Sequence, residues 1–147
     1  MKKAEPVKEV LVTVSSIQYN KEQEMDQMQL VVPGKYYKKN GKHYIFYDEV
    51  SDEDAAITKN MIKLDSDTLE IRKKGAVSVY MLFQKDRKHM TFYQTPFGRL
   101  TMGILTRKIC MEEKKSNLDI RFGYALEIND EHTADCEVVI SVAPKIS

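Results

Sequence analysis

The chain has 147 residues, including 23 Lys and Arg and 22 Asp and Glu, and its formal net charge is +1 at pH 7. This length suits a single domain, 1–147, with a sizeable core. The balanced charge argues against a dedicated nucleic-acid binder, although it leaves room for a local basic patch. With 42% hydrophobic and 31% charged residues, the composition is that of a soluble globular domain rather than a disordered segment.

The N-terminus and the cysteines favour a cytoplasmic protein. The opening residues lack the unbroken apolar core of a signal peptide, and no apolar run elsewhere is long enough to span a bilayer. We therefore expect no membrane association. Cys110 and Cys136 form neither a zinc pattern nor a CxxC pair. Because the cytosol disfavours disulfides, we expect two free thiols.

Short segments with apolar residues at every second position follow one another along the chain, with turn residues between them. A period of two is typical of strands that bury one face. Pro33-Gly34 predicts an edge or a bulge in the second strand, because proline cannot donate a ladder hydrogen bond. The segments predicted as strands are 7–18, 28–32, 36–39, 42–47, 56–64, 69–72, 77–83, 90–95, 100–104, 118–128 and 136–142.

The segment from Leu118 to Ile128 carries the clearest strand pattern. Its even positions hold six large apolar residues, and its odd positions are charged, small or polar. As a strand, the segment places all six on one side. This pattern predicts a long antiparallel strand with its even positions inward and its other face in water.

Asn40-Gly41 is the strongest local turn signal. It lies between two runs rich in Tyr and Lys, and an Asn-Gly pair favours a type I′ hairpin turn. That register sets Lys39 opposite Lys42 and Tyr37 opposite Tyr44. The Tyr pair should stabilise the hairpin, and the Lys pair should weaken it slightly.

Taken together, these signals predict an all-β fold of about 8–10 antiparallel strands. Regular spacing of short strands with turns between them is typical of a β-sandwich or a closed barrel. We find no convincing helix, no sequence repeat and no linker that would divide the chain.

The chain resembles the YwiB family of small, functionally uncharacterised bacterial proteins. The resemblance is carried by Tyr93-Gln-Thr95-Pro-Phe97-Gly98-Arg-Leu100, Thr106 and Tyr124, with Gly34, Tyr36, Tyr37, Thr58, Ile62, Gly75, Met81 and Phe83. It implies a single up-and-down barrel of the calycin or lipocalin type in a bacterial cytosol, and it supplies no catalytic residues. One departure is that Arg72 precedes Lys73-Lys74-Gly75, where family members tend to show Arg-x-Gly.

Residue patterns for catalysis are missing from the chain. His43, His89 and His132 fall in or beside three different turns, without other ligands at metal-binding spacing. There is no GxSxG elbow and no Gly-rich phosphate loop. Carboxylates cluster in loops and on the predicted outer faces, where nothing tunes their pKa values. We expect no enzyme activity, no metal and no cofactor.

A ligand site inside the barrel is the first functional hypothesis. About eight strands leave an interior that side chains just fill, or that holds one small ligand. Eight methionines could either line an adaptable apolar pocket or simply fill gaps. For a small apolar molecule we expect an interior site formed by Thr58, Arg72, Met81, Phe83, Tyr93, Thr95, Met102, Phe122, Tyr124 and Leu126.

A surface interaction is the alternative hypothesis. Lysines and tyrosines interleave along the hairpin 35–47, and stacking combined with phosphate contacts is how proteins bind single-stranded nucleic acid. Lysines at a hairpin tip and tyrosines in strands are equally ordinary structural choices. A protein partner or a homodimer is at least as well supported as nucleic acid. The residues expected to bind nucleic acid are Tyr37, Lys38, Lys39, Lys42 and Tyr44.

Overall fold

The computed structural model describes residues 5–75 and 78–145, which form ten β-strands and no helix. Val77, assigned above to a strand, and the first four residues, on which the interpretation of the N-terminus partly depends, lie outside the described residues. The strands are β1 (Lys8–Asn20), β2 (Met25–Lys39), β3 (Lys42–Val50), β4 (Ile57–Asp65), β5 (Thr68–Gly75), β6 (Ser78–Gln84), β7 (Lys88–Thr95), β8 (Gly98–Glu113), β9 (Leu118–Ile128) and β10 (Glu131–Pro144).

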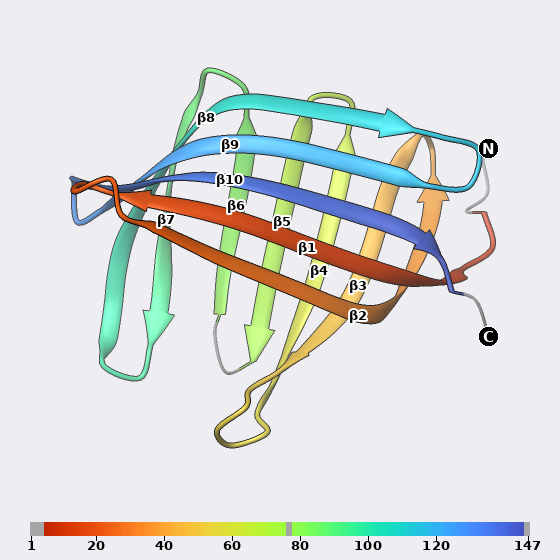
Figure 1. Ribbon diagram of the computed structural model, residues 1–147, viewed down its shortest axis with the longest axis horizontal. Helices are drawn as coiled ribbons and strands as arrows, with labels where there is room; N and C mark the ends of the chain where they lie inside the picture. Colours follow the sequence, from red (N-terminus) through yellow and green to blue (C-terminus); the bar gives the residue numbers. More distant parts are fainter. Residues whose placement is uncertain (1–4, 76–77, 146–147) are drawn as a thin grey trace.

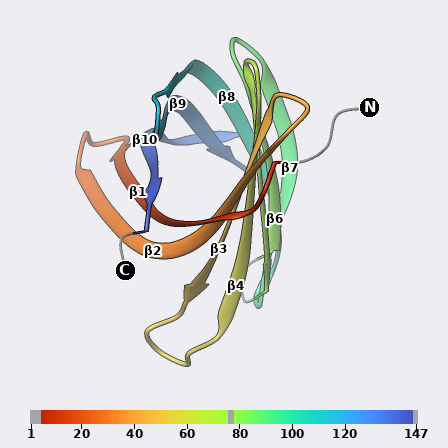
Figure 2. The ribbon, with the colours of Figure 1, turned by 90° about the vertical axis from the view of Figure 1, so that its right-hand side faces the viewer.

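Each strand pairs antiparallel with the strand that follows it, and β10 pairs with β1 to close the barrel. This up-and-down order confirms the predicted all-β antiparallel barrel. In Figure 1, β9, β10, β1 and β2 run along the long axis, and β3 to β7 run across them. Figure 2 shows these two sets of strands as facing walls. None of the described residues forms a helix of the kind that could span a membrane.

Strand β9 begins and ends where the sequence pattern predicts. Its even positions face the core: Leu118, Ile120 and Phe122 are at most 4% exposed, and Tyr124 and Leu126 pack against the core cluster. Arg121, at an odd position, is exposed. The period-two pattern therefore predicted which face of β9 is buried.

The long strand β2 pairs with β1 from Met25 to Tyr36 and with β3 from Gly34 to Lys39. Pro33 pairs with Leu11 of β1, so β2 is continuous where the sequence analysis separated the segments 28–32 and 36–39. The predicted edge, by contrast, is confirmed. Pairing between β2 and β3 begins only at Gly34, so β2 has an unpaired edge before it. A Cβ atom at Gly34 would lie 2.6 Å from the Phe46 carbonyl oxygen, so glycine permits the two strands to approach here.

The interior of the barrel is filled with side chains. The rings of Phe83, Phe122 and Tyr124 contact one another, with centroids 4.8, 5.0 and 6.1 Å apart. Cys136 is buried beside them in a hydrogen bond with Tyr124, and Cys110 is exposed. Both cysteines are free thiols, as predicted.

Candidate functional site

One end of the barrel gathers polar side chains on its inner face. The β2–β3 hairpin turns at Asn40-Gly41, where both residues adopt positive φ angles, as the predicted type I′ turn requires. The resulting register pairs Lys38 with His43. Because Ile45, two residues after His43, is fully buried, His43 also faces inward and is only 2% exposed. The hairpin thus carries a histidine into the barrel.

His43 lies between a tyrosine and a carboxylate. The Tyr36 hydroxyl lies 2.7 Å from His43 Nδ1, and His43 Nε2 lies 3.8 Å from Glu113 Oε1. Lys38 Nζ donates to both carboxylate oxygens of Glu113, at 3.1 and 3.3 Å. Strand β8 brings Glu113 to this end of the barrel, so the four side chains join three strands. We refer to Tyr36, Lys38, His43 and Glu113 as the mouth network.

Burial sets the protonation of the mouth network. It lowers the pKa of His43, and Glu113 only partly opposes this effect. It also raises the pKa of Tyr36 to about 12, an increase to which the charges of Glu113 and Glu5 add. The Nδ1 atom of a neutral His43 therefore accepts a hydrogen bond from the Tyr36 hydroxyl, and the Nε2–H group points toward Glu113.

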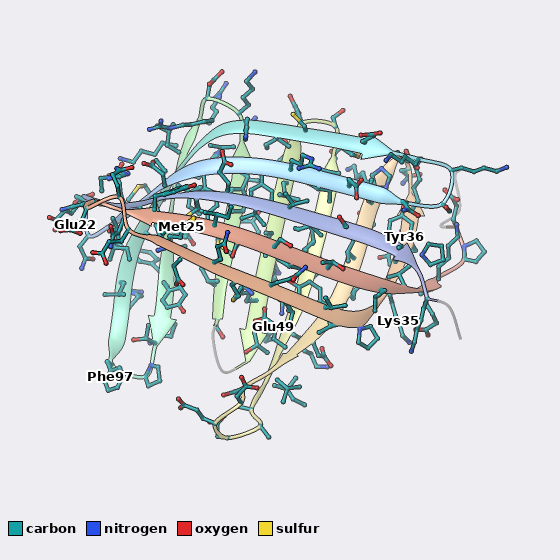
Figure 3. The ribbon with its side chains drawn as sticks, viewed as in Figure 1. Glu22, Met25, Lys35, Tyr36, Glu49 and Phe97 are labelled. Atoms are coloured by element: carbon teal, nitrogen blue, oxygen red, sulfur yellow. The ribbon has the colours of Figure 1, made fainter. Side chains whose placement is uncertain are left out.

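A pocket of about 340 Å³ opens beside the mouth network, at the end of the barrel where Tyr36 is labelled in Figure 3. Its apolar floor includes Val10, Leu118 and Val142, each 4% exposed. Its polar wall includes Tyr36, Lys38 and Glu113. The complete lining, here called the mouth pocket, is Glu5, Lys8, Glu9, Val10, Tyr36, Lys38, Glu113, Lys114, Lys115, Ser116, Asn117, Leu118, Val142 and Pro144.

The arrangement suits recognition of a molecule with one apolar and one polar part. Tyr36 keeps its proton, and its oxygen can still accept a hydrogen bond from a ligand. Lys38 and Glu113 offer a cation and an anion at the same wall. Within the described part of the chain, no three His, Cys, Asp or Glu side chains gather closely enough to hold a metal ion.

The residues predicted to bind a ligand in the interior are mostly core residues. Phe83, Met102 and Phe122 are buried, and Met81, Tyr93, Tyr124 and Leu126 pack against them. Thr58 is buried near the start of β4. Thr95 belongs to the β7–β8 turn, where its Oγ1 accepts from the Phe97 N–H and donates to the Gly98 carbonyl. The structure brings most of these residues together, but they pack against one another in the core instead of lining a ligand site.

The sequence analysis placed Arg72 in the barrel interior, which is wrong, because Arg72 lies on the outer face. It is exposed, and its guanidinium lies 5.2 Å from the centroid of the Tyr80 ring. The alternation of β5 instead turns Lys73 inward. Lys73 belongs to the segment Lys73-Lys74-Gly75, where the sequence departs from the family pattern. Lys73 Nζ contacts Glu49 Oε1 at 2.5 Å and Asn60 Oδ1 at 2.8 Å.

The hairpin residues proposed for nucleic acid are divided between two faces. Tyr37 stacks on Tyr44 at 4.8 Å on the outer face, in the register predicted from Asn40-Gly41. Lys39 and Lys42 share that face, and Lys42 pairs with Asp65 at 3.7 Å. Lys38 does not belong to this group, since it points into the mouth network.

Sequence reasoning missed the inward polar residues. It placed all three histidines in exposed turns, which is wrong for His43. It also placed carboxylates outside, whereas Glu49 and Glu113 contact inward side chains. A signal was available for His43, because the Asn40-Gly41 register and the alternation of His43, Ile45 and Tyr47 put the histidine on the apolar face.

With the geometry established, comparisons with known proteins identify the family. A family model described as a domain of unknown function (DUF1934) matches residues 12–140. The chain belongs to the DUF1934 family. The curated proteins include no match to it.

A solved structure confirms the fold of this DUF1934 protein. The crystal structure of the ywiB protein from Bacillus subtilis superposes with a TM-score of 0.84 and 19% sequence identity. The match covers 97% of this chain and 96% of that chain. At this identity the likeness concerns the fold alone. It agrees with the sequence resemblance to the YwiB family described above.

Proposed function

We propose that this DUF1934 protein is a cytoplasmic, non-catalytic binding protein that holds one small amphipathic molecule in the mouth pocket. The observation that carries this proposal is the pairing of an apolar floor with the mouth network in one concave site. Its volume, about 340 Å³, falls within the range of small-molecule sites. The apolar part of the ligand lies on Val10, Leu118 and Val142, and its polar group faces Tyr36 and Lys38.

The site supports binding at the mouth rather than in the centre of the barrel. The rings of Phe83, Phe122 and Tyr124 fill the centre, where they contact one another. At the mouth, by contrast, the side chains of Val10, Leu118 and Val142 border an open pocket. The proposal therefore keeps the small-molecule ligand expected from the sequence, but the ligand is amphipathic rather than apolar and binds at the end of the barrel rather than in its interior.

The chemistry of the mouth network favours recognition over catalysis. A general base takes a proton from the reacting group, so it must itself be unprotonated near neutral pH. Tyr36, with its pKa raised to about 12, holds its proton and acts as a hydrogen-bonding group. His43 is 2% exposed and stands behind Tyr36, so it orients the tyrosine without reaching the ligand.

The charges around the mouth pocket favour a ligand with an anionic group. Among the lining residues, lysines outnumber carboxylates by one. Glu113 is engaged by Lys38 at 3.1 Å, and Lys114 pairs with Glu112 at 3.6 Å. Lys8 and Lys115 have no carboxylate within ion-pair distance among the described residues. They stand at the opening, where they would attract a carboxylate or a phosphate.

Titration with anilinonaphthalene sulfonate, an amphipathic anion, tests the proposal. We expect the wild type to bind it saturably with one-to-one stoichiometry. Ser116 lines the pocket from the exposed β8–β9 loop, so Ser116→Trp should fill the pocket without disturbing the core. We expect this variant to lose the binding and keep the wild-type melting temperature.

The matched control is Glu22→Trp, which puts the same ring in the β1–β2 turn at the opposite end of the molecule (Figure 3). Its binding curve should be that of the wild type. Absence of saturable binding by the wild type, or equal losses in the two Trp variants, would refute a site at the mouth.

A further inference from the structure

The outer face of the wall formed by β2 to β5 is strongly basic. Register and alternation place seven cations and three carboxylates on this face, which gives it a net charge of +4 in a chain whose total is +1. We call this surface the basic face. Its charged residues are Lys35, Lys39, Lys42, Asp48, Lys59, Lys63, Asp65, Glu70, Arg72 and Lys74.

Internal ion pairs leave part of this positive charge uncompensated. The three carboxylates are each taken by one lysine: Asp65 lies 3.7 Å from Lys42, Asp48 lies 3.9 Å from Lys59, and Glu70 lies 3.6 Å from Lys63. Among the described residues, no carboxylate lies within ion-pair distance of Lys39, Arg72 or Lys74. These three cations are available to an anionic partner.

Aromatic rings stand in a column on the same face. Tyr37 stacks on Tyr44 at 4.8 Å with 12° between the ring planes, and on Phe46 at 5.8 Å with 17°. Tyr37 is the middle ring, so Phe46 and Tyr44 end the column. Lys63 Nζ lies 5.9 Å from the Tyr44 centroid, and Phe46 is 36% exposed. The Phe46 end of the column is therefore the more open one.

A hollow lies directly beside Phe46. It forms where β2 and β3 diverge, because Pro33 has no N–H and their pairing starts at Gly34. The hollow is open, has a volume of about 570 Å³ and is lined by Pro33, Phe46 and Val50. Lys35 and Lys59 stand at its rim, where Lys35 pairs with Glu9 at 4.0 Å and Lys59 pairs with Asp48 at 3.9 Å. An aromatic wall and apolar sides are suited to a planar base, and the unpaired cations of the basic face are suited to the phosphates attached to it.

We propose that the basic face binds single-stranded nucleic acid, with one base stacked on Phe46 in this hollow. The phosphates on either side contact Lys39, Arg72 and Lys74. Stacking provides contacts that tolerate any base, and phosphate contacts release counterions from the strand. The surface is distinct from the mouth pocket, whose network lies on the inner face of the same hairpin. It also differs from the hairpin site expected from the sequence, since Lys38 is excluded and residues of β4 and β5 are included.

Fluorescence anisotropy with labelled 12-mers of uridine and of thymidine tests this proposal and distinguishes RNA from DNA. We expect saturable binding at low salt, with a linear fall of log affinity against log salt. The triple change Lys39→Gln, Arg72→Gln and Lys74→Gln should reduce that slope by about 2, the value for three lost phosphate contacts on a single strand. The control triple Arg107→Gln, Lys108→Gln and Arg121→Gln removes equal charge from the exposed face of β8 and β9, and should leave the slope unchanged.

A second pair of variants tests the stacking contact. Phe46→Ala should weaken binding at least about fivefold, the low end of the loss when a stacked base loses its ring, without altering the salt slope. The control Phe97→Ala removes a fully exposed ring at the distant β7–β8 turn (Figure 3), and should have no effect. No binding at low salt, equal slopes in both triple variants, or equal affinity for a glutamate peptide of the same charge would overturn the proposal.

Discussion

At the scale of single residues, the hydrogen bond between Tyr36 and His43 determines how the mouth of the barrel is held. Both groups are partly or fully removed from water, and the neutral imidazole has few other partners within reach. When a buried acceptor loses its donor, the free energy lost by removing it from water is no longer offset by a hydrogen bond, and the fold is destabilised. The tyrosine therefore stabilises the fold and shapes the mouth pocket with the same hydroxyl.

Tyr36→Phe should lower the free energy of unfolding by about 1–3 kcal/mol, because it leaves His43 Nδ1 without its partner. Urea unfolding at neutral pH measures this loss. Tyr37→Phe is the control, since Tyr37 sits at the next position on the outer face. Equal effects of the two changes would show that the hydroxyl of Tyr36 has no special partner.

The low pKa of His43 predicts how stability depends on pH. Burial favours the neutral ring in the fold, so the folded pKa lies below the unfolded value of about 6.5. As pH falls through that value, the unfolded chain takes up a proton that the folded protein resists, and stability decreases. Glu113 and Glu5 oppose this effect, and Lys38 adds to it.

Comparison with His43→Gln isolates this contribution, because the two proteins share every other ionisable group. The stability advantage of the wild type should shrink between about pH 7.5 and pH 5.5, as followed by urea unfolding. An advantage that stays constant or grows toward low pH would mean that His43 is charged in the fold.

At the scale of elements, strand β9 shows what a sequence can determine. Large residues at its even positions have one way to be buried together, so the pattern gave both its ends and its register. Alternation also predicted the stacked pair Tyr37–Tyr44 across the Asn40-Gly41 turn. The inward placement of Arg72 went against this alternation, which puts Leu69 and Ile71 on the buried face and Arg72 outside. A shift of one residue exchanges the two faces of a strand.

The mouth network was harder to predict because its members come from distant strands. Glu113 is 70 positions from His43 in the chain, and only barrel closure brings the two together. A long polar residue at the end of a strand also looks the same from sequence whether it faces water or a pocket. Pattern reasoning therefore recovers the core more readily than the site.

Paired substitutions test the register of β9. Phe122→Ala should reduce the free energy of unfolding by about 3–5 kcal/mol, because it removes a buried ring and leaves a cavity. The neighbouring change Arg121→Ala should cost less than about 0.5 kcal/mol, as expected for an exposed side chain. Denaturant melts in the reverse order would contradict the assigned faces.

At the scale of the whole molecule, the barrel separates a packed centre from a binding end. Leu126 pairs with Ile104 and packs against the core cluster. Leu126→Trp should therefore overpack the interior and destabilise the protein by about 1–3 kcal/mol. Binding of anilinonaphthalene sulfonate at the mouth should remain, measured below the melting transition. Loss of binding without loss of stability would place the ligand in a hollow centre.

The most direct test of the mouth site is native mass spectrometry of the protein purified from cells, with Ser116→Trp purified in parallel. We predict that the wild type retains one small molecule, released on denaturation, and that Ser116→Trp has the mass of the bare chain. A wild type of bare mass, or a molecule retained equally by both proteins, would contradict a ligand site at the mouth of the barrel.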